Sequence, residues 1–168
     1  MEAMAYCRWL TARYLAAGMI DARSVIRLPT EAEWERAARG TRAHLYPSGE
    51  DYRKGYANID ETPADPDGLC LRETTAVGLY PRDASPDGLL DCAGNVSEWC
   101  LNKFADPDDT DTTGDAGRSL RGGSWYYSPA VARAVGRNWN IPVNRNYSVG
   151  FRLMCTCPIP LTTDPLIH

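Results

Sequence analysis

Between residues 41 and 118 the sequence carries proline, glycine, aspartate or asparagine every few positions and sustains no helical period. Two pieces, Pro66–Leu69 and Pro86–Leu89, share one turn chemistry, in which proline fixes φ and glycine accepts a positive φ. So long an irregular stretch needs an organiser, because unpaired backbone groups are costly when buried. We therefore expect loop-rich structure with short strands, and a bound metal is one candidate organiser.

Two helices are expected before this stretch. Good helix formers fill residues 2–17, and Gly18 can close that helix in the left-handed conformation. Thr30 and Glu33 form a capping-box pattern that predicts a second helix over residues 31–39. Later in the chain, the segments 119–125 and 149–154 read as strands, with mostly loop between them.

Length and charge exclude several classes of protein. The chain has 168 residues, which suits one domain, and its net charge of −4 argues against a nucleic-acid binder that relies on a basic surface. No stretch approaches the roughly 20 apolar residues of a membrane helix. Glu2, Arg8 and Arg13 interrupt the N-terminal stretch, so no signal peptide is visible and the compartment stays open.

Six cysteines are too few for a disulfide-built scaffold of this length, and we expect mostly reduced or buried thiols. Only Cys155 and Cys157 are close in sequence, and one intervening residue suits neither a zinc knuckle nor a redox pair. The acidic residues 105–118 faintly resemble a calcium loop, but Leu120 stands where the bidentate glutamate belongs. A solvated surface loop is the expectation there.

Four motifs in order resemble the formylglycine-generating enzyme (sulfatase-modifying factor) family. They are Arg27–Glu35 (RLPTEAEWE), Asp91–Trp99 (DCAGNVSEW), Leu120–Trp125 (LRGGSW) and Gly150–Arg152 (GFR). The resemblance implies an α+β, C-type-lectin-like fold over a single domain, residues 1–168. Family domains carry several strands before the first helix, whereas this sequence opens at that helix. It is interpreted as N-terminally shortened, or as completed by another chain.

The same resemblance implies two calcium sites. The first would use Asn58, the Ile59 carbonyl, Asp67 and the Leu69 carbonyl; the second would use Asp91, the Gly94 and Val96 carbonyls and Glu98. Calcium takes six to eight oxygen ligands and tolerates carbonyls, so both sets are chemically sensible. The alternative for the second set is a loop fixed by hydrogen bonds from its own side chains, without a metal.

The catalytic cysteines of the family's oxidases are missing. Those enzymes bind copper(I) through two cysteines shortly after the Arg-Gly-Gly-Ser motif, because copper(I) prefers thiolates. Residues 125–137 of this chain contain no cysteine. We therefore expect no copper and assign no catalytic residue; the residues favour a binding protein, and an oxidase or other family enzyme is the alternative.

Residues 126–148 have the composition of a binding surface. Four of the chain's seven asparagines lie between 138 and 146, tyrosine and serine flank them, and lysine and acidic residues are absent. This layout resembles the variable proteins of diversity-generating retroelements, which overwrite adenines in a C-terminal repeat. Asparagine codons changed at adenines reach Tyr, Ser, Val and Ile but not Trp, so Trp139 is interpreted as scaffold, like Pro142 and the arginines.

The candidate variable, ligand-contacting positions follow from that resemblance: Tyr126, Tyr127, Ser128, Val131, Val135, Asn138, Asn140, Ile141, Val143, Asn144, Asn146, Tyr147 and Ser148. An aromatic and polar platform suits a protein or peptide partner. An undiversified family domain remains an alternative, since asparagine also satisfies irregular backbone and large aromatics are often core.

Overall fold

The computed structural model describes residues 2–156, so Cys157 and the residues after it lie outside the description. Its elements in chain order are α1 (Glu2–Ala16), β1 (Val25–Arg27), α2 (Glu31–Arg39), the 3-10 turn η1 (Pro81–Asp83), β2 (Ser97–Lys103), β3 (Arg118–Arg121), β4 (Arg137–Asn140), β5 (Val149–Gly150) and β6 (Met154–Thr156). Helices and short strands mix with long loops, which confirms the expected α+β class.

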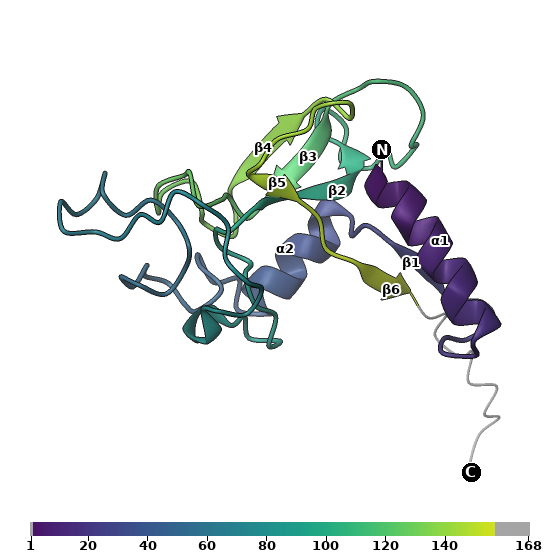
Figure 1. The fold of residues 1–168 in the computed structure, drawn as a ribbon, viewed down its shortest axis with the longest axis horizontal. Helices are drawn as coiled ribbons and strands as arrows, with labels where there is room; N and C mark the ends of the chain where they lie inside the picture. The colour runs from purple at the N-terminus through teal and green to yellow at the C-terminus, as the bar shows by residue number, and fades with distance from the viewer. Residues whose placement is uncertain (1, 157–168) are drawn as a thin grey trace, which may run out of the picture.

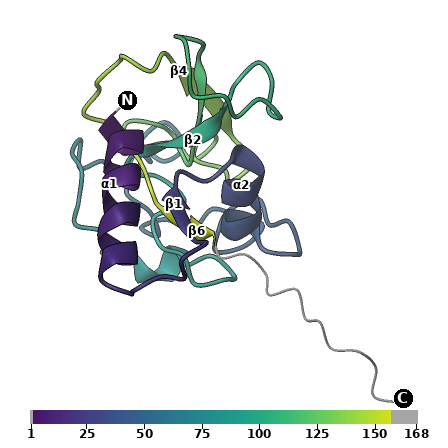
Figure 2. The ribbon, with the colours of Figure 1, turned by 90° about the vertical axis from the view of Figure 1, so that its right-hand side faces the viewer.

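Two small sheets organise the fold. The larger has the order β4-β3-β2-β5, antiparallel except for the parallel β2–β5 pair. The smaller pairs β1 with β6, antiparallel. In Figure 1 the larger sheet lies above α2, and the loops between α2 and β2 gather at the end of the molecule away from α1. Figure 2 shows α1 and α2 on either side of the β1–β6 ladder.

Both predicted helices are confirmed. Gly18 follows α1 at φ +65°, and the Met19 amide donates to the Tyr14 carbonyl, as a left-handed closing residue allows. The capping box of α2 is complete, because Thr30 Oγ1 accepts from the Glu33 amide while Glu33 Oε2 accepts from the Thr30 amide. The hydrogen bond from Arg27, with those from Thr30, lowers the pKa of Glu33 to about 2 against the opposing effect of burial.

The predicted strand boundaries are partly wrong. β3 ends at Arg121, not at 125, because Gly122 (φ +87°) and Gly123 (φ +68°) turn the chain. The strand expected over 149–154 is two short strands, β5 and β6, which join different sheets. β4 lies inside the segment expected to be loop, and β2 was not predicted. Both gain their conformation from cross-strand pairing, which no local pattern encodes.

Buried side chains organise the long loops. Glu61 is almost fully buried; its carboxylate accepts from the Gly55 and Leu69 amides and from the Tyr52 hydroxyl. One of the two matching turns takes the positive φ expected of its glycine, Gly88 at φ +82°; Gly68 does not. The acidic residues 105–118 form an exposed loop up to Gly117, as expected.

Five cysteines lie in the described part of the chain, and all are free thiols: Cys7, Cys70, Cys92, Cys100 and Cys155. Three of them are buried in the core clusters, which agrees with the expectation of mostly reduced or buried thiols. Burial raises the pKa of Cys92 to about 12, which agrees with its place in a core cluster. Among residues 2–156, no helix combines the length and the apolar character needed to cross a bilayer.

Candidate ligand-binding surface

A buried ion-pair network lies beneath residues 126–148. At its centre is Glu31, in the first turn of α2 and almost fully buried. Its carboxylate accepts from Arg121 Nη1 at 2.9 Å and from Arg137 Nε at 2.5 Å. Ser119 Oγ also donates to it, and Asn102 Oδ1 accepts from the Glu31 amide. Burial opposes ionisation, but the hydrogen bonds from Arg137 and Ser119 and the charge of Arg121 hold the pKa of Glu31 below its usual value.

Arg121 carries this network to the segment itself. It is 1% exposed, its guanidinium lies 5.3 Å from the Trp34 ring, and its Nη2 donates to Glu35 and to the Ala134 carbonyl. The Ala134 amide in turn donates to the Leu45 carbonyl. The arginine of the Arg-Gly-Gly-Ser motif is therefore a structural anchor, which fixes the backbone of residues 126–136 against the core.

Most candidate contact positions face solvent. Exposed are Tyr126, Val131, Ile141, Val143, Asn144, Asn146 and Tyr147; partly exposed are Tyr127, Ser128, Val135, Asn138 and Asn140. The structure removes Ser148 from this set. Ser148 is buried, its hydroxyl and amide donate to Asn146 Oδ1, and its carbonyl accepts from the Ser97 amide where β2 begins. A ligand cannot touch it directly.

Several asparagines serve the local backbone, as the alternative interpretation holds. Asn140 Oδ1 accepts from the Ile141 amide and from Asn144 Nδ2, and Asn146 Oδ1 closes the turn before Ser148. Trp139, interpreted as scaffold, packs one face against Gly117 and Phe104 but remains half exposed. Composition alone therefore overstated how many asparagines are free to meet a ligand.

The exposed segment encloses a pocket of about 450 Å³. Among its lining residues are Tyr127, Val131, Val135 and Asn138, together with Gly123, Arg133 and Arg137 from the scaffold. None of the lining residues is acidic, and of the two lining arginines Arg137 is already paired with Glu31. The volume lies within the range of sites that hold a small molecule or one inserted side chain.

Residues outside the predicted segment complete the surface. A second pocket beside Tyr126 is walled partly by Asp60, Cys70 and Arg72, none of which was predicted. The Asp60 amide donates to the Tyr127 carbonyl at 3.0 Å, which holds the two stretches together. The resemblance placed variation only at the C-terminus, and no local pattern marks residues 60–72 as its neighbours.

The second predicted calcium set does not fit a dedicated cation site. Both Glu98 oxygens are taken by the Arg152 guanidinium, at 2.5 and 2.8 Å, and Trp34 Nε1 also donates to Glu98. A divalent cation there would meet the positive charge of Arg152. Asp91 Oδ2 accepts from the Gly78 amide, as in the metal-free alternative. The carbonyls of Gly94 and Val96 stay predicted ligands, but the Glu98 carboxylate is not free to bind a cation with them.

The first predicted calcium set keeps one open oxygen. Asn58 is 3% exposed, and its Oδ1 has no hydrogen-bond donor among the described residues. An orphaned buried oxygen is a group that a calcium ion would satisfy. Asp67 is exposed, and the Leu69 carbonyl already accepts from the Glu61 amide, which leaves it a second lone pair. Ile59 is buried beside Asn58. In residues 2–156 no cluster of three or more His, Cys, Asp or Glu could hold a metal.

The model of the sulfatase-modifying factor enzyme 1-like domain matches residues 1–157. The chain belongs to this family. One relative is the serine/threonine-protein kinase pkn1 of Chlamydia pneumoniae, which is 38% identical over 75% of this chain and 20% of its own length. Another is the hercynine oxygenase of Mycobacterium tuberculosis, which is 34% identical over 90% of this chain and 34% of its own length. This chain of the sulfatase-modifying factor family thus spans a fifth of the first relative and about a third of the second.

A solved structure extends the comparison. Treponema denticola variable protein 1 superimposes with a TM-score of 0.59 and 31% identity, over 80% of this chain and 49% of that one. The fold expected from the four motifs is thereby confirmed as that of the formylglycine-generating enzyme and C-type-lectin-like group. The similarity to a variable protein was also expected from residues 126–148.

Proposed function

We propose that this sulfatase-modifying factor domain is a non-catalytic binding protein, which presents residues 126–148 to a protein or peptide partner as a variable surface. The observation that carries the proposal is a contrast within that segment: Tyr126 and Val131 are exposed, whereas buried Arg121 bonds the Ala134 carbonyl and fixes the backbone of residues 126–136. A fixed backbone lets side chains change without loss of the fold.

Two further observations support it. Residues 126–136, where the family's oxidases hold copper, contain no cysteine in this chain. Tyrosines present rigid contact area at low entropic cost, and the exposed pair Tyr126 and Tyr147 flanks the segment. The similarity to the Treponema denticola variable protein points the same way.

The coding DNA tests diversification directly. We expect an adenine-rich near-copy of the 3′ end and a reverse transcriptase gene nearby. Differences between related copies should fall at codons of exposed positions such as 126, 143 and 147. They should spare Trp139, because changes at adenines of an asparagine codon do not produce a tryptophan codon. Absence of the repeat and of the reverse transcriptase, or differences concentrated at Trp139 and Arg121, would remove the proposal.

Calcium remains part of the proposal at the first site only, where it would occupy the loop of Asn58 and Asp67. Titration of calcium into chelator-stripped protein should give saturable heat and a raised melting temperature. At a hundredfold excess of calcium over Kd, the free energy of unfolding should rise by about 2.7 kcal/mol. Asp67→Asn should weaken binding, whereas Asp115→Asn in the acidic loop should not. A wild-type protein that shows neither heat nor a thermal shift contradicts calcium here.

A family enzyme is the second candidate, favoured by the similarity to hercynine oxygenase over 90% of this chain. A cysteine-oxidising activity would require copper binding and conversion of a cysteine peptide, which mass spectrometry detects. The chain spans 34% of that relative's length.

A further inference from the structure

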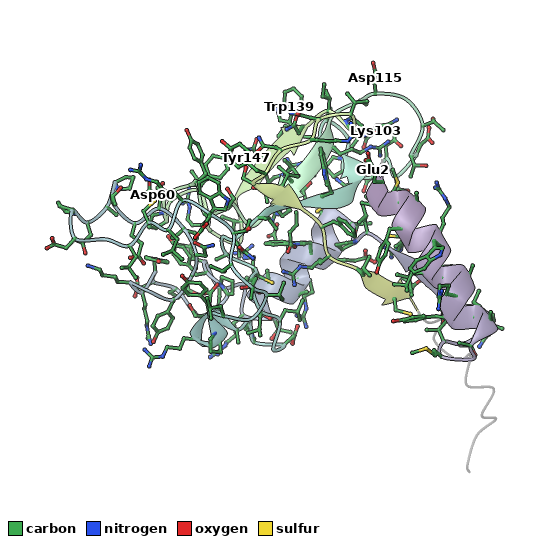
Figure 3. The ribbon with its side chains drawn as sticks, in the orientation of Figure 1. Glu2, Asp60, Lys103, Asp115, Trp139 and Tyr147 are labelled. Carbon is green, nitrogen blue, oxygen red and sulfur yellow. The ribbon has the colours of Figure 1, made fainter. Side chains whose placement is uncertain are left out.

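The pocket beside Tyr126 joins two distant parts of the chain. It measures about 340 Å³, and its lining residues are Asp60, Cys70, Arg72, Trp125, Tyr126 and Tyr147. Figure 3 shows Asp60 and Tyr147 toward the same end of the molecule, far from Asp115 in the acidic loop. Half of the lining therefore comes from residues 60–72, which lie outside the proposed variable segment.

This pocket holds two opposite charges that are not paired with each other. Asp60 Oδ1 accepts from the Thr62 hydroxyl and amide, and no cation of the described chain lies within ion-pair distance of Asp60. The Thr62 hydrogen bonds, with smaller effects from Cys70 and the Arg72 charge, lower the pKa of Asp60, so it is ionised at neutral pH. Arg72 is exposed, and nothing in residues 2–156 pairs with its guanidinium.

Aromatic rings supply the rest of the lining. Trp125 and Tyr147 stack at 5.5 Å with 25° between their planes, and Tyr126 meets Trp125 edge-on at 5.9 Å. Tyr126 and Tyr147 are 63% and 73% exposed, whereas Trp125 is buried and its Nε1 has no acceptor among the described residues. A buried donor without a partner is uncommon and suits a site that receives an acceptor.

We propose that this pocket binds a small zwitterion, an α-amino acid with an aromatic side chain. Asp60 would accept from its ammonium group, and Arg72 would hold its carboxylate through the two-pronged guanidinium. The side chain of the ligand would pack on Tyr126 and Tyr147. A ligand with only one charge would be attracted by one of these two residues and repelled by the other. A zwitterion is attracted by both, so the two charges together select it.

This inference goes beyond the proposed partner surface and does not depend on diversification. The groups that choose the ligand class, Asp60 and Arg72, lie outside residues 126–148. Only the aromatic residues Tyr126 and Tyr147 belong to both. A change at Tyr126 or Tyr147 would then alter which amino-acid side chain is preferred, while the charged groups would stay constant.

Isothermal titration with L-phenylalanine at pH 7 tests the proposal, beside two blocked analogues. N-acetyl-L-phenylalanine lacks the ammonium, and L-phenylalaninamide lacks the carboxylate. We expect the free amino acid to bind and each analogue to bind about tenfold more weakly or worse, since each loses one charge-assisted hydrogen-bonding group. Asp60→Asn should abolish the preference over the acetylated analogue, and Arg72→Gln the preference over the amide.

Matched controls separate these effects from general loss of charge. Asp115→Asn and Arg42→Gln remove the same charges at exposed positions outside the pocket and should leave all three affinities unchanged. The melting temperature of each variant shows whether it folds. Absence of heat with L-phenylalanine in folded wild-type protein, or equal affinity for free and blocked forms, overturns the proposal. Preference for the acetylated analogue would also overturn it and indicate an anion site. None of these outcomes bears on the coding-DNA test of diversification.

Discussion

Arg121→Met is expected to lower the unfolding free energy by about 3–5 kcal/mol, because it strands Glu31 as a buried charge that has lost its buried partner. The side chain of Arg121 is fully buried, and it contacts Glu31, Glu35 and the Ala134 carbonyl. Methionine fills similar volume, so the loss reflects the broken network and not a cavity. Urea unfolding followed by tryptophan fluorescence measures it.

Arg137→Met is the matched control, because Arg137 also bonds Glu31 but is 41% exposed in its side chain. Water can replace that partner, and we expect a loss of about 1 kcal/mol. Hydrogen exchange adds a local readout: in Arg121→Met the amides of residues 126–136 should exchange faster than in Arg137→Met. Equal losses from the two variants would show that Arg121 does not anchor this segment.

Local chemistry explains what the sequence predicted well. The capping box of Thr30 and Glu33 and the closing residue Gly18 act within one or two turns of chain, so α1 and α2 could be placed to within a residue. β4 could not, because its residues take strand conformation by pairing Asn138 with Leu120 across the sheet. A short strand with three polar residues and one tryptophan, such as this one, carries little signal of its own.

The candidate surface divides in the same way. The exposed tyrosines follow from composition and from the resemblance to variable proteins, both of which are visible in one segment. Asp60 and Arg72 could not be predicted in this way, because they lie far in sequence from the tyrosines they meet; the Asp60 amide, for example, donates to the Tyr127 carbonyl. Glu98 was assigned to calcium by resemblance, and its pairing with Arg152 depends on a contact 54 residues away in the sequence. Long-range contacts thus decide which polar groups are free to bind.

Gly94→Ala is expected to be among the most damaging single substitutions in the chain, at about 3–5 kcal/mol. A Cβ on Gly94 would lie 2.5 Å from Ile59 Cγ2 and 2.9 Å from the Asn58 carbonyl carbon, and φ is +81°. Gly94 and Asn58 form the bridge that fastens the 58–72 loop to the entry of β2. The variant therefore combines overpacking with left-handed strain.

Gly88→Ala isolates the strain, because Gly88 has nearly the same φ of +82° but no atom within 4 Å of an added Cβ. It should cost only about 1–2 kcal/mol. Chemical unfolding gives the loss of unfolding free energy for both variants. The difference between the two losses measures the cost of the steric overlap between the added Cβ and the residues 58–59. If the two alanine variants lose the same stability, the bridge yields to the methyl group, and the 58–72 loop is not held by it. In that case the wall formed by Asp60 and Arg72 would have to be positioned by the Asp60–Tyr127 bond instead, and Gly94→Ala would leave amino-acid binding intact.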